Sequence, residues 1–198
     1  MSMVIRAVAQ AAVVGSFALL TFQAPAAAQD LSEKSMKTIM EYAWAFTPDR
    51  FTRPNGETIE IDKKKKDSVV VPLDTAKEII KAGRLSAHAQ TCRLLEEQVL
   101  NHRSLMKREE MKNKWSPQQI VYINQLHLIT VMLLTGKVKL VAKGEGKKEI
   151  AAEKSNEPSG QSCTPEQAAK VKELITAYVK SGPPVSLGKA PPKEQAKK

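Results

Sequence analysis

Apolar residues recur at helical spacing along most of the chain, and the clearest helix is predicted over residues 117–135. Ser116 suits the N-cap position, and Pro117 suits the first helical position. Gly136 can take the left-handed conformation that ends a helix. From Leu126 onward the segment is apolar almost all the way round, which is typical of a helix in the middle of a core.

Two further helices are predicted near the ends of the chain. The first runs from a cap at Asp30 or Ser32 through about Phe46. Pro48 ends this pattern because the residue before a proline disfavours the helical conformation. The second is an amphipathic helix within residues 163–181, where the apolar residues form one stripe.

Another helical pattern begins at Asp74, which suits the N-cap, and its apolar stripe continues through Leu95, Val99 and Met106. It is compatible with one long helix and with two helices joined near residues 94–96. Gly83 lies inside this pattern. Because glycine costs about 1 kcal/mol relative to alanine inside a helix, we expect a close crossing with another helix at this position.

The remaining apolar segments have β-type patterns. Asn55 and Gly56 form a turn signal followed by alternating apolar and polar residues up to Ile61, which predicts a hairpin. Residues 69–71, all valine, form a second β-type run, and residues 138–141 are a candidate additional strand. The predicted fold is mainly α: a small helical bundle around a buried central helix, with a minor β-hairpin patch and a C-terminal amphipathic helix.

Composition divides the chain into five parts. An apolar stretch after Arg6 leads to an A-x-A motif, which predicts a signal peptide cleaved between Ala28 and Gln29. The parts are a signal peptide (1–28), a helical domain with a small β patch (29–142), a flexible linker (143–162), a C-terminal helix (163–181) and a disordered basic tail (182–198).

A cleaved signal peptide predicts export to the periplasm, or secretion where the host lacks an outer membrane. The longest uninterrupted apolar run of the central helix extends only from Val131 to Leu134. A membrane span requires ~18 apolar residues, so no span is predicted in the mature chain.

Basic residues exceed acidic residues in the exported part of the chain. Removing Arg6 leaves 30 of the 31 basic residues against 21 acidic ones, a formal charge of +9. The excess is spread out and aromatic residues are few, whereas nucleic-acid binders concentrate charge and interleave aromatics. We therefore expect a protein or an anionic cell-envelope component as partner, and no nucleic acid. The lysine cluster at residues 63–66 is interpreted as a solvated loop rather than an anion contact.

The two cysteines of the chain are Cys92 and Cys163. Export to an oxidising compartment makes a disulfide between them the expected state. Such a bridge would close a loop of 72 residues (92–163 inclusive) and attach the C-terminal helix to the bundle. The chain-entropy model gives a stabilisation of roughly 4 kcal/mol for a loop of that size.

Two alternative interpretations use Cys92 chemically. His88 and Cys92 lie one helical turn apart, as a base and a nucleophile could, but no orienting acid or oxyanion motif accompanies them. A metal or small-ligand site would combine His88, Cys92, His102 and His127, although the paired spacing typical of zinc ligands does not occur. His102 and His127 are instead interpreted as hydrogen-bonded core or boundary residues.

The sequence contains no phosphate-binding loop, nucleophile elbow or haem motif, so no cofactor is predicted. The acidic pairs at 96–97 and 109–110 are interpreted as solvated faces, because adjacent helical residues point in different directions. The leading hypothesis is an exported, soluble, non-enzymatic binding protein. A metal or small-ligand carrier and, less favoured, a thiol-dependent enzyme are the alternatives, and the partner and oligomeric state stay open.

Overall fold

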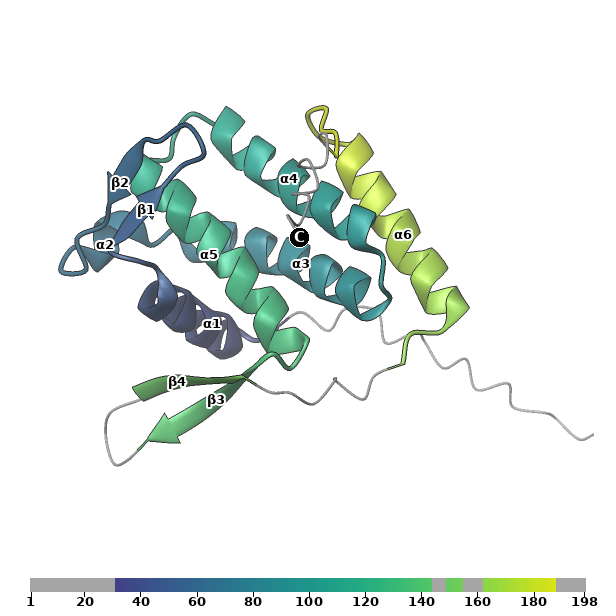
Figure 1. The fold of residues 1–198 in the computed structure, drawn as a ribbon, viewed down its shortest axis with the longest axis horizontal. Helices are drawn as coiled ribbons and strands as arrows, with labels where there is room; N and C mark the ends of the chain where they lie inside the picture. Colours follow the sequence, from purple (N-terminus) through teal and green to yellow (C-terminus); the bar gives the residue numbers. More distant parts are fainter. Residues whose placement is uncertain (1–30, 144–148, 155–161, 188–198) are drawn as a thin grey trace, which may run out of the picture. The chain divides into compact units, whose positions relative to one another are not determined.

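The computed structural model describes residues 31–143, 149–154 and 162–187, and within them the chain is mainly helical (Figure 1). The predicted signal peptide with its cleavage site at Ala28 and Gln29, and residues 188–198 of the tail, lie outside these ranges. The elements are α1 (Glu33–Phe46), β1 (Arg50–Thr52), β2 (Thr58–Glu60), α2 (Lys66–Val69), α3 (Leu73–Thr91), α4 (Leu95–Met111), α5 (Pro117–Leu134), β3 (Val138–Lys143), β4 (Glu149–Lys154) and α6 (Pro165–Lys180).

Helix α5 occupies the centre of the bundle, as predicted. Ser116 and Gln119 form the capping box, each side chain accepting a hydrogen bond from the other's backbone N–H. At the other end Gly136 has a φ of 69°, and the N–H of Lys137 donates to the carbonyl of Met132 at 3.0 Å, which closes a Schellman motif. The helix boundaries are therefore encoded locally.

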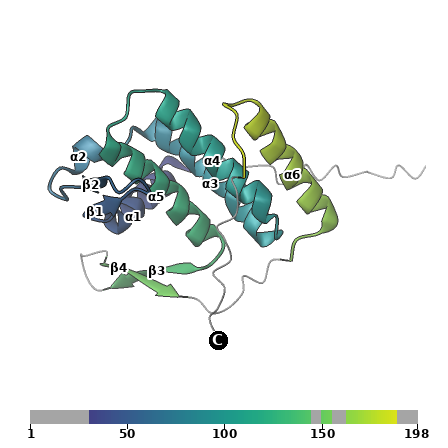
Figure 2. The same cartoon turned by 45° about the horizontal axis from the view of Figure 1, so that its top comes forward.

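Helices α1, α3 and α4 pack around α5, and α6 lies on the outer side of α3 and α4 (Figures 1 and 2). Their apolar faces share one main core, which also takes in residues of the hairpin and of the turn before α3. The largest fully buried apolar side chains of this core are Tyr122, Ile79, Ile80, Leu105, Ile123, Leu126 and Val71. The predicted helical bundle is confirmed.

Gly83 of α3 marks the closest approach between α3 and α5. A Cβ atom at this position would lie 2.7 Å from Cβ of Thr130 and 3.3 Å from the carbonyl oxygen of His127. No side chain larger than hydrogen fits without a shift of one helix. The predicted close crossing is confirmed.

The pattern that begins near Asp74 forms two helices rather than one. Helix α3 starts two residues earlier than predicted, because Pro72 rather than Asp74 is the N-cap residue and Asp74 lies in the first turn. The helix ends at Thr91, and Arg93, the residue after the C-cap, takes the left-handed conformation with a φ of 58°. Hydrogen bonds from Arg93 N–H to the Gln90 carbonyl (3.1 Å) and from Leu94 N–H to the Ala89 carbonyl (2.8 Å) complete a second Schellman motif.

The hairpin predicted around residues 55–56 is present as β1 and β2, paired antiparallel with Phe51 opposite Ile59. The β-type interpretation of residues 69–71 is wrong. Val69 ends the short helix α2, and Val71 is buried in the main core immediately before Pro72. Three consecutive apolar residues do not distinguish a strand from a buried turn, and a proline removes a ladder hydrogen bond.

The candidate strand at residues 138–141 is confirmed as part of β3, which pairs antiparallel with β4. Strand β4 lies inside the segment 143–162 that composition predicted to be a flexible linker, so that prediction is wrong for residues 149–154. The register brings Lys139 opposite Glu153 and Val138 opposite Lys154. The rest of the predicted linker, at 144–148 and 155–161, lies outside the described residues.

Helix α6 packs through one apolar stripe against α3 and the start of α4. Val171 and Ile175 are buried there in a small cluster with Ala89, which is separate from the main core. Thr164 caps the helix and forms a capping box with Gln167, as the sequence predicted for residues 163–181. Among the described helices none is long and apolar enough to cross a lipid bilayer.

Candidate functional site

An apolar strip borders the groove between α4 and α5. Leu95 and Val99 lie on one face of α4 and are 65% and 40% exposed, and Leu128 of α5 is 44% exposed. The two helices are antiparallel and meet where His102 contacts Asn124. Val99 lies one helical turn before His102 and Leu128 lies one turn after Asn124, so antiparallel packing puts these two side chains at about the same level along α4 and α5.

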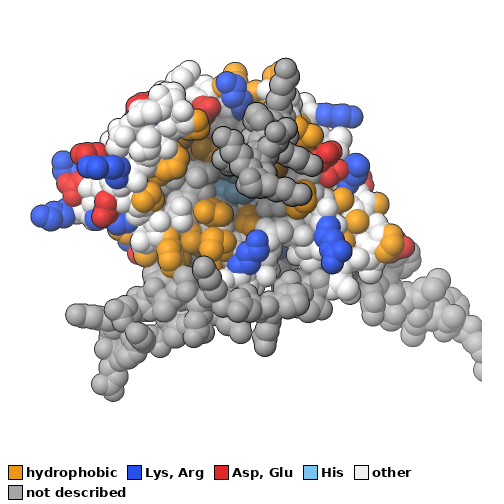
Figure 3. Space-filling view, in the orientation of Figure 1, with side chains coloured by type: hydrophobic (Ala, Val, Ile, Leu, Met, Phe, Trp, Pro, Cys, Tyr) orange, Lys and Arg blue, Asp and Glu red, His pale blue; other side chains and the backbone are white. Residues whose placement is uncertain are grey.

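Figure 3 shows hydrophobic side chains gathered on this face of the molecule, with histidine atoms visible in a hollow between them. Met106 of α4 and Ile120 of α5 extend the strip beyond His102, and both are half-buried against the main core. The groove thus has apolar side chains at both ends and a polar contact in the middle. Exposed apolar side chains gathered in this way are a feature of surfaces that contact other molecules.

Two histidines lie at the floor of the groove. The Nε2–H of His102 donates to Oδ1 of Asn124 at 2.8 Å, and the ring centroids of His102 and His127 are 4.7 Å apart. His102 is half-buried, whereas His127 is buried. The prediction that both are hydrogen-bonded core or boundary residues agrees with these contacts.

His127 belongs to a buried polar network that joins three helices. Its Nε2 lies 2.9 Å from Oγ of Ser86 on α3, and Nδ2 of Asn101 on α4 donates to the same oxygen at 2.8 Å. Asn101 also donates to the carbonyl of Ala82 at 2.8 Å. Because Asn101 uses Ser86 as an acceptor, the serine hydroxyl can donate to Nε2 of a neutral His127.

The contact between Ser86 and His127 resembles the serine–histidine pair of a hydrolase only in its distance. Ser86 is fully buried and Asn101 is buried beside it, so a substrate does not reach the hydroxyl. Oδ1 of Asn101 is the one buried side-chain polar atom without a hydrogen-bond partner among the described residues. We interpret the network as a connection between α3, α4 and α5 rather than as a catalytic centre.

Burial dominates the electrostatics of this network. Burial is the larger cause, and the nearby His102 the smaller cause, of a pKa of His127 that is lowered from 6.5 to about 3. The pKa of His88 is also lowered, by partial burial and by the positive charge of Arg84. Both imidazoles are therefore neutral near pH 7.

The four residues of the hypothetical metal or ligand site do not come together. His102 and His127 are neighbours, but His88 is exposed on α3 and Cys92 is joined to Cys163. Within residues 31–143, 149–154 and 162–187 no three histidine, cysteine, aspartate or glutamate residues are grouped so that they could hold a metal ion.

The structure places Cys92 and Cys163 as a disulfide pair, with Cα atoms 5.0 Å apart. Cys92 is the C-cap residue of α3, and Cys163 immediately precedes the N-cap of α6. The bridge thus fixes the start of α6 to the end of α3. In this state Cys92 has no thiol, so it cannot act as the nucleophile beside His88.

Arg108 fixes the other end of α6. Its Nη2 donates to the carbonyl of Tyr178 at 2.5 Å and to Oγ of Ser181 at 2.8 Å, and its guanidinium lies 4.5 Å from the centre of the Tyr178 ring. The chain then passes Gly182, where a Cβ would lie 2.6 Å from the guanidinium carbon of Arg108. Helix α6 is therefore held at both termini and runs parallel to α4.

The segment after α6 returns across α4. Val185 and Ser186 line a hollow of about 290 Å³ with α4 residues, and the guanidinium of Arg103 donates to the carbonyl of Ser186. The other lining residues are His102, Met106, Lys107 and Glu110. This hollow therefore lies along α4 beside His102 and Met106.

The lysine cluster at residues 63–66 is only partly a solvated loop. Lys63 donates to the carbonyls of Trp44 (2.7 Å) and Thr47 (2.5 Å), which satisfies the last turn of α1, and its ammonium lies 4.3 Å from the Trp44 ring centre. Lys66 pairs with Glu41 at 2.6 Å. Partial burial lowers the pKa of Lys63. The solvated-loop interpretation is wrong for Lys63, and half of the cluster is engaged within the fold.

The interpretation of the acidic pairs as solvated agrees with the exposed Glu96 and Glu110 but is wrong for their neighbours in sequence. Glu109 is buried, and its carboxylate accepts hydrogen bonds from Nε1 of Trp115 (2.8 Å) and Nζ of Lys112 (2.7 Å). Glu97 is half-buried and pairs with Lys172 of α6 at 3.1 Å. These carboxylates hold helices and a loop together, so they are not solvated.

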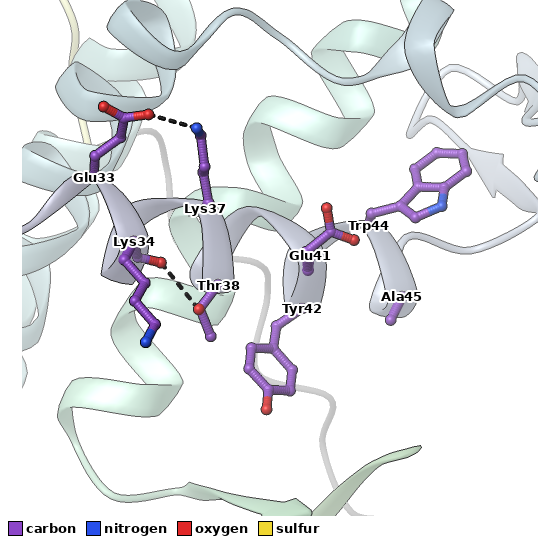
Figure 4. Close-up of a pocket in the computed structure, with 8 residues that line it drawn as sticks. All are labelled: Glu33, Lys34, Lys37, Thr38, Glu41, Tyr42, Trp44 and Ala45. Atoms are coloured by element: carbon purple, nitrogen blue, oxygen red, sulfur yellow. Dashed lines mark hydrogen bonds and ion pairs between the residues drawn. The ribbon is translucent and has the colours of Figure 1, made fainter. Parts of the chain in front are cut away.

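A larger hollow, of about 540 Å³, lies along one face of α1 (Figure 4). Both carboxylates of its lining are paired, because Glu33 contacts Lys37 and Glu41 contacts Lys66. The residues that line it are Glu33, Lys34, Lys37, Thr38, Glu41, Tyr42, Trp44 and Ala45. Since the described lining comes from a single helix, this hollow does not bring side chains from different elements together as a site requires.

No protein-family model, curated protein sequence or solved structure matches the chain. The candidate site is therefore argued from the residues of the chain. Sequence analysis placed Leu95, Val99 and Met106 on one helical stripe. It did not identify Asn101 and Ser86 as buried residues of the network around His127, because no local pattern marks them.

Proposed function

We propose that the chain is an exported, non-enzymatic binding protein that takes part of its partner into the groove between α4 and α5. The observation that carries this proposal is the apolar strip of Leu95, Val99 and Leu128, three exposed side chains on one groove. Isolated exposed apolar residues are normal on protein surfaces, whereas a contiguous strip rimmed by polar residues marks an interaction site.

The chemistry of the groove favours a protein partner over an anionic envelope surface. The strip can contact apolar side chains of a partner. The hydrogen-bonded pair of His102 and Asn124 interrupts the strip and can fix the register in which a partner segment binds. The densest lysine cluster, in contrast, uses Lys63 and Lys66 within the fold. The partner segment that suits such a groove is an amphipathic helix or an extended apolar peptide.

Two further observations support the non-enzymatic and exported character. The one Cys–His pair of the sequence lacks a thiol when Cys92 is bonded to Cys163, and the buried Ser86 is out of reach of a substrate. A cysteine pair at disulfide distance is compatible with an oxidising compartment such as the periplasm. The signal-peptide pattern of residues 1–28 points the same way.

The test compares partner retention by three forms of the exported protein, each immobilised and exposed to the exported protein fraction. The native form and a Leu174→Asp control should retain the same partner, because Leu174 is similarly exposed but lies on α6. The double variant Val99→Asp, Leu128→Asp should lose at least 90% of it. Circular dichroism verifies that all three are folded.

Retention of the same partner by the groove variant would contradict the proposed site. Turnover of a substrate by the purified protein in a hydrolase or redox screen would contradict the non-enzymatic character. A stoichiometric metal ion in the native preparation, lost on replacing His102, would support a carrier instead.

A further inference from the structure

The two walls of the groove differ in charge. Helix α5 contains no aspartate, glutamate, lysine or arginine from Pro117 to Leu134. Helix α4 carries Arg103 and Lys107, which are both exposed and lie one helical turn apart. A partner in the groove therefore meets uncharged side chains along α5 and two cations along α4.

The two cations flank the apolar strip on the side away from α5. Each residue of an α-helix is rotated by about 100° from the residue before it. Around α4 the order is then His102, Val99, Arg103 and Lys107, spread over about 140° of the helix circumference. Because His102 contacts Asn124 of α5, Arg103 and Lys107 form the outer rim of the strip.

The rim cations differ from many other cations of the fold in lacking a carboxylate partner. Exposed cations such as Lys37, Arg50 and Lys81 pair with glutamates. In the part of the chain that the structure describes, neither Arg103 nor Lys107 forms such a pair. Two like charges one turn apart destabilise a helix, and a carboxylate from another molecule would relieve this repulsion.

The guanidinium of Arg103 is held in place at the rim. One of its N–H groups donates to the carbonyl of Ser186, in the segment that follows α6. A guanidinium has several further N–H donors, which suit a contact with a carboxylate. Lys107 lines the same hollow, with Met106 between the two cations in sequence. The cations and apolar side chains thus share one concave surface, and the fixed arginine lowers the entropy that binding costs.

The acidic residues on this side of α4 lie at the two ends of the rim. Glu96 and Glu110 are both exposed, seven residues before Arg103 and three residues after Lys107. At 1.5 Å per residue the four charges extend over about 21 Å, in the order negative, positive, positive, negative. A complementary partner therefore has its carboxylates at the middle of the bound segment rather than at its ends.

We propose that the groove binds an amphipathic helix of a partner protein, whose apolar stripe covers Val99 and Leu128 and whose two carboxylates, one turn apart, meet Arg103 and Lys107. Residues four apart are separated by about 6 Å along any α-helix, so the two charge pairs match when the helices pack side by side. Complementary charges of this kind select a partner and fix its register. This inference rests on the groove of the proposed function and adds the chemistry of the partner.

Two synthetic peptides of about 18 residues, or five helical turns, test the chemistry of the partner. Both have the same leucine stripe. One carries a central pair of glutamates four residues apart beside the stripe, and the other carries lysines at the same two positions. We expect the exported chain to bind the glutamate peptide about tenfold more tightly in fluorescence anisotropy, with a smaller ratio at high salt.

Reversing the charge of the rim provides a second measurement. The double variant Arg103→Glu, Lys107→Glu should bind the lysine peptide more tightly than the glutamate peptide. The matched control Lys34→Glu, Lys64→Glu changes the net charge by the same amount at exposed positions on α1 and in the loop before α2. This control should keep the preference of the native chain. Circular dichroism verifies that both variants are folded.

Four outcomes would overturn the inference: no binding of the glutamate peptide, equal binding of the two peptides, a preference unchanged by reversal of the rim, or a preference reversed in the control. The proposed function is judged separately, by retention of the partner from the exported fraction. Retention that depends on Val99 and Leu128 but not on Arg103 and Lys107 would leave the proposed function standing while removing the acidic partner.

Discussion

Gly83 shows how a single hydrogen atom in place of a side chain sets the distance between two helices. An alanine Cβ at this position would lie 2.7 Å from Cβ of Thr130 and 2.8 Å from its Cγ2. Neither atom belongs to the flexible end of a long side chain, so relief requires movement of a helix. The centre of the bundle is therefore intolerant of added volume here.

We expect Gly83→Ala to lower the free energy of unfolding by about 1–3 kcal/mol, as overpacking of a core does. Helix propensity alone predicts the opposite effect, an increase in the free energy of unfolding of about 1 kcal/mol. Urea denaturation at constant m-value measures the difference. The double variant Gly83→Ala, Thr130→Ser removes Cγ2 and should recover part of the loss, whereas a Gly83→Ala protein more stable than the native form would refute the close crossing.

The sequence predicted the structural role of a single residue only where neighbouring residues in the chain indicated that role. A glycine inside a helix pattern indicated a crossing at position 83. Glu109 carried no such indication, because its burial depends on Trp115 folding back from the following loop. Asn101 is likewise buried through partners on α3, which helical spacing on α4 does not identify.

The elements were predictable to the extent that their ends are encoded by side chains. Helix α5 matches its prediction to within one residue at its C-terminal end, because Ser116 and Gly136 fix its termini locally. The break between α3 and α4 was left open, because Arg93 takes the left-handed position where glycine is the usual signal. Strand β4 was not predicted, because Glu149–Lys154 lies in a stretch whose Gly, Lys, Glu and Ser content is typical of a linker, although it pairs with β3 across only five intervening residues.

Helix α6 is the element most dependent on a covalent link. Its stripe buries Val171 and Ile175 in a small cluster outside the main core, and a long segment separates it from α5. The pair of Cys92 and Cys163 and the contacts of Arg108 hold its two ends. We expect the disulfide to supply much of the stability of this docking.

Replacing both cysteines by alanine should lower the free energy of unfolding by roughly 4 kcal/mol, since the bridge spans 71 positions of the chain. Amide hydrogen exchange should accelerate in α6 more than in α5, which lies in the main core. Reduced native protein should behave as the variant does. Equal exchange rates in α6 with and without the bridge would contradict this expectation, and would show that Arg108 and the apolar stripe are enough to keep α6 docked on α3 and α4.

The groove belongs to the scale of the whole molecule. Leu95 and Val99 lie on a stripe that sequence analysis treated as continuing the helix pattern, and only the pairing of α4 with α5 shows that they border Leu128 at the surface. The same pairing brings His102 against His127. Sequence patterns assign faces to single helices, but a groove is a property of two helices in register.

The network beneath the groove predicts how the stability of the whole bundle varies with pH. The pKa of His127 is about 3 in the folded protein and about 6.5 in an unfolded chain, so the unfolded state binds the proton more tightly. The contribution of His127 is fully present above pH 6.5 and is lost as pH falls toward 3. We expect protonation of this residue in the unfolded state to lower the free energy of unfolding by about 1.4 kcal/mol as the pH falls from 7.5 to 5.5.

Urea denaturation across that pH range compares the native form with His127→Gln, whose side chain is neutral and can still hydrogen-bond to Ser86. The variant should lose about 1.4 kcal/mol less than the native form over the interval. His88→Gln controls for the second histidine with a lowered pKa. If His127→Gln kept the full pH dependence, the imidazole would be protonated within the folded bundle, and the network joining α3, α4 and α5 would have to accommodate a charge.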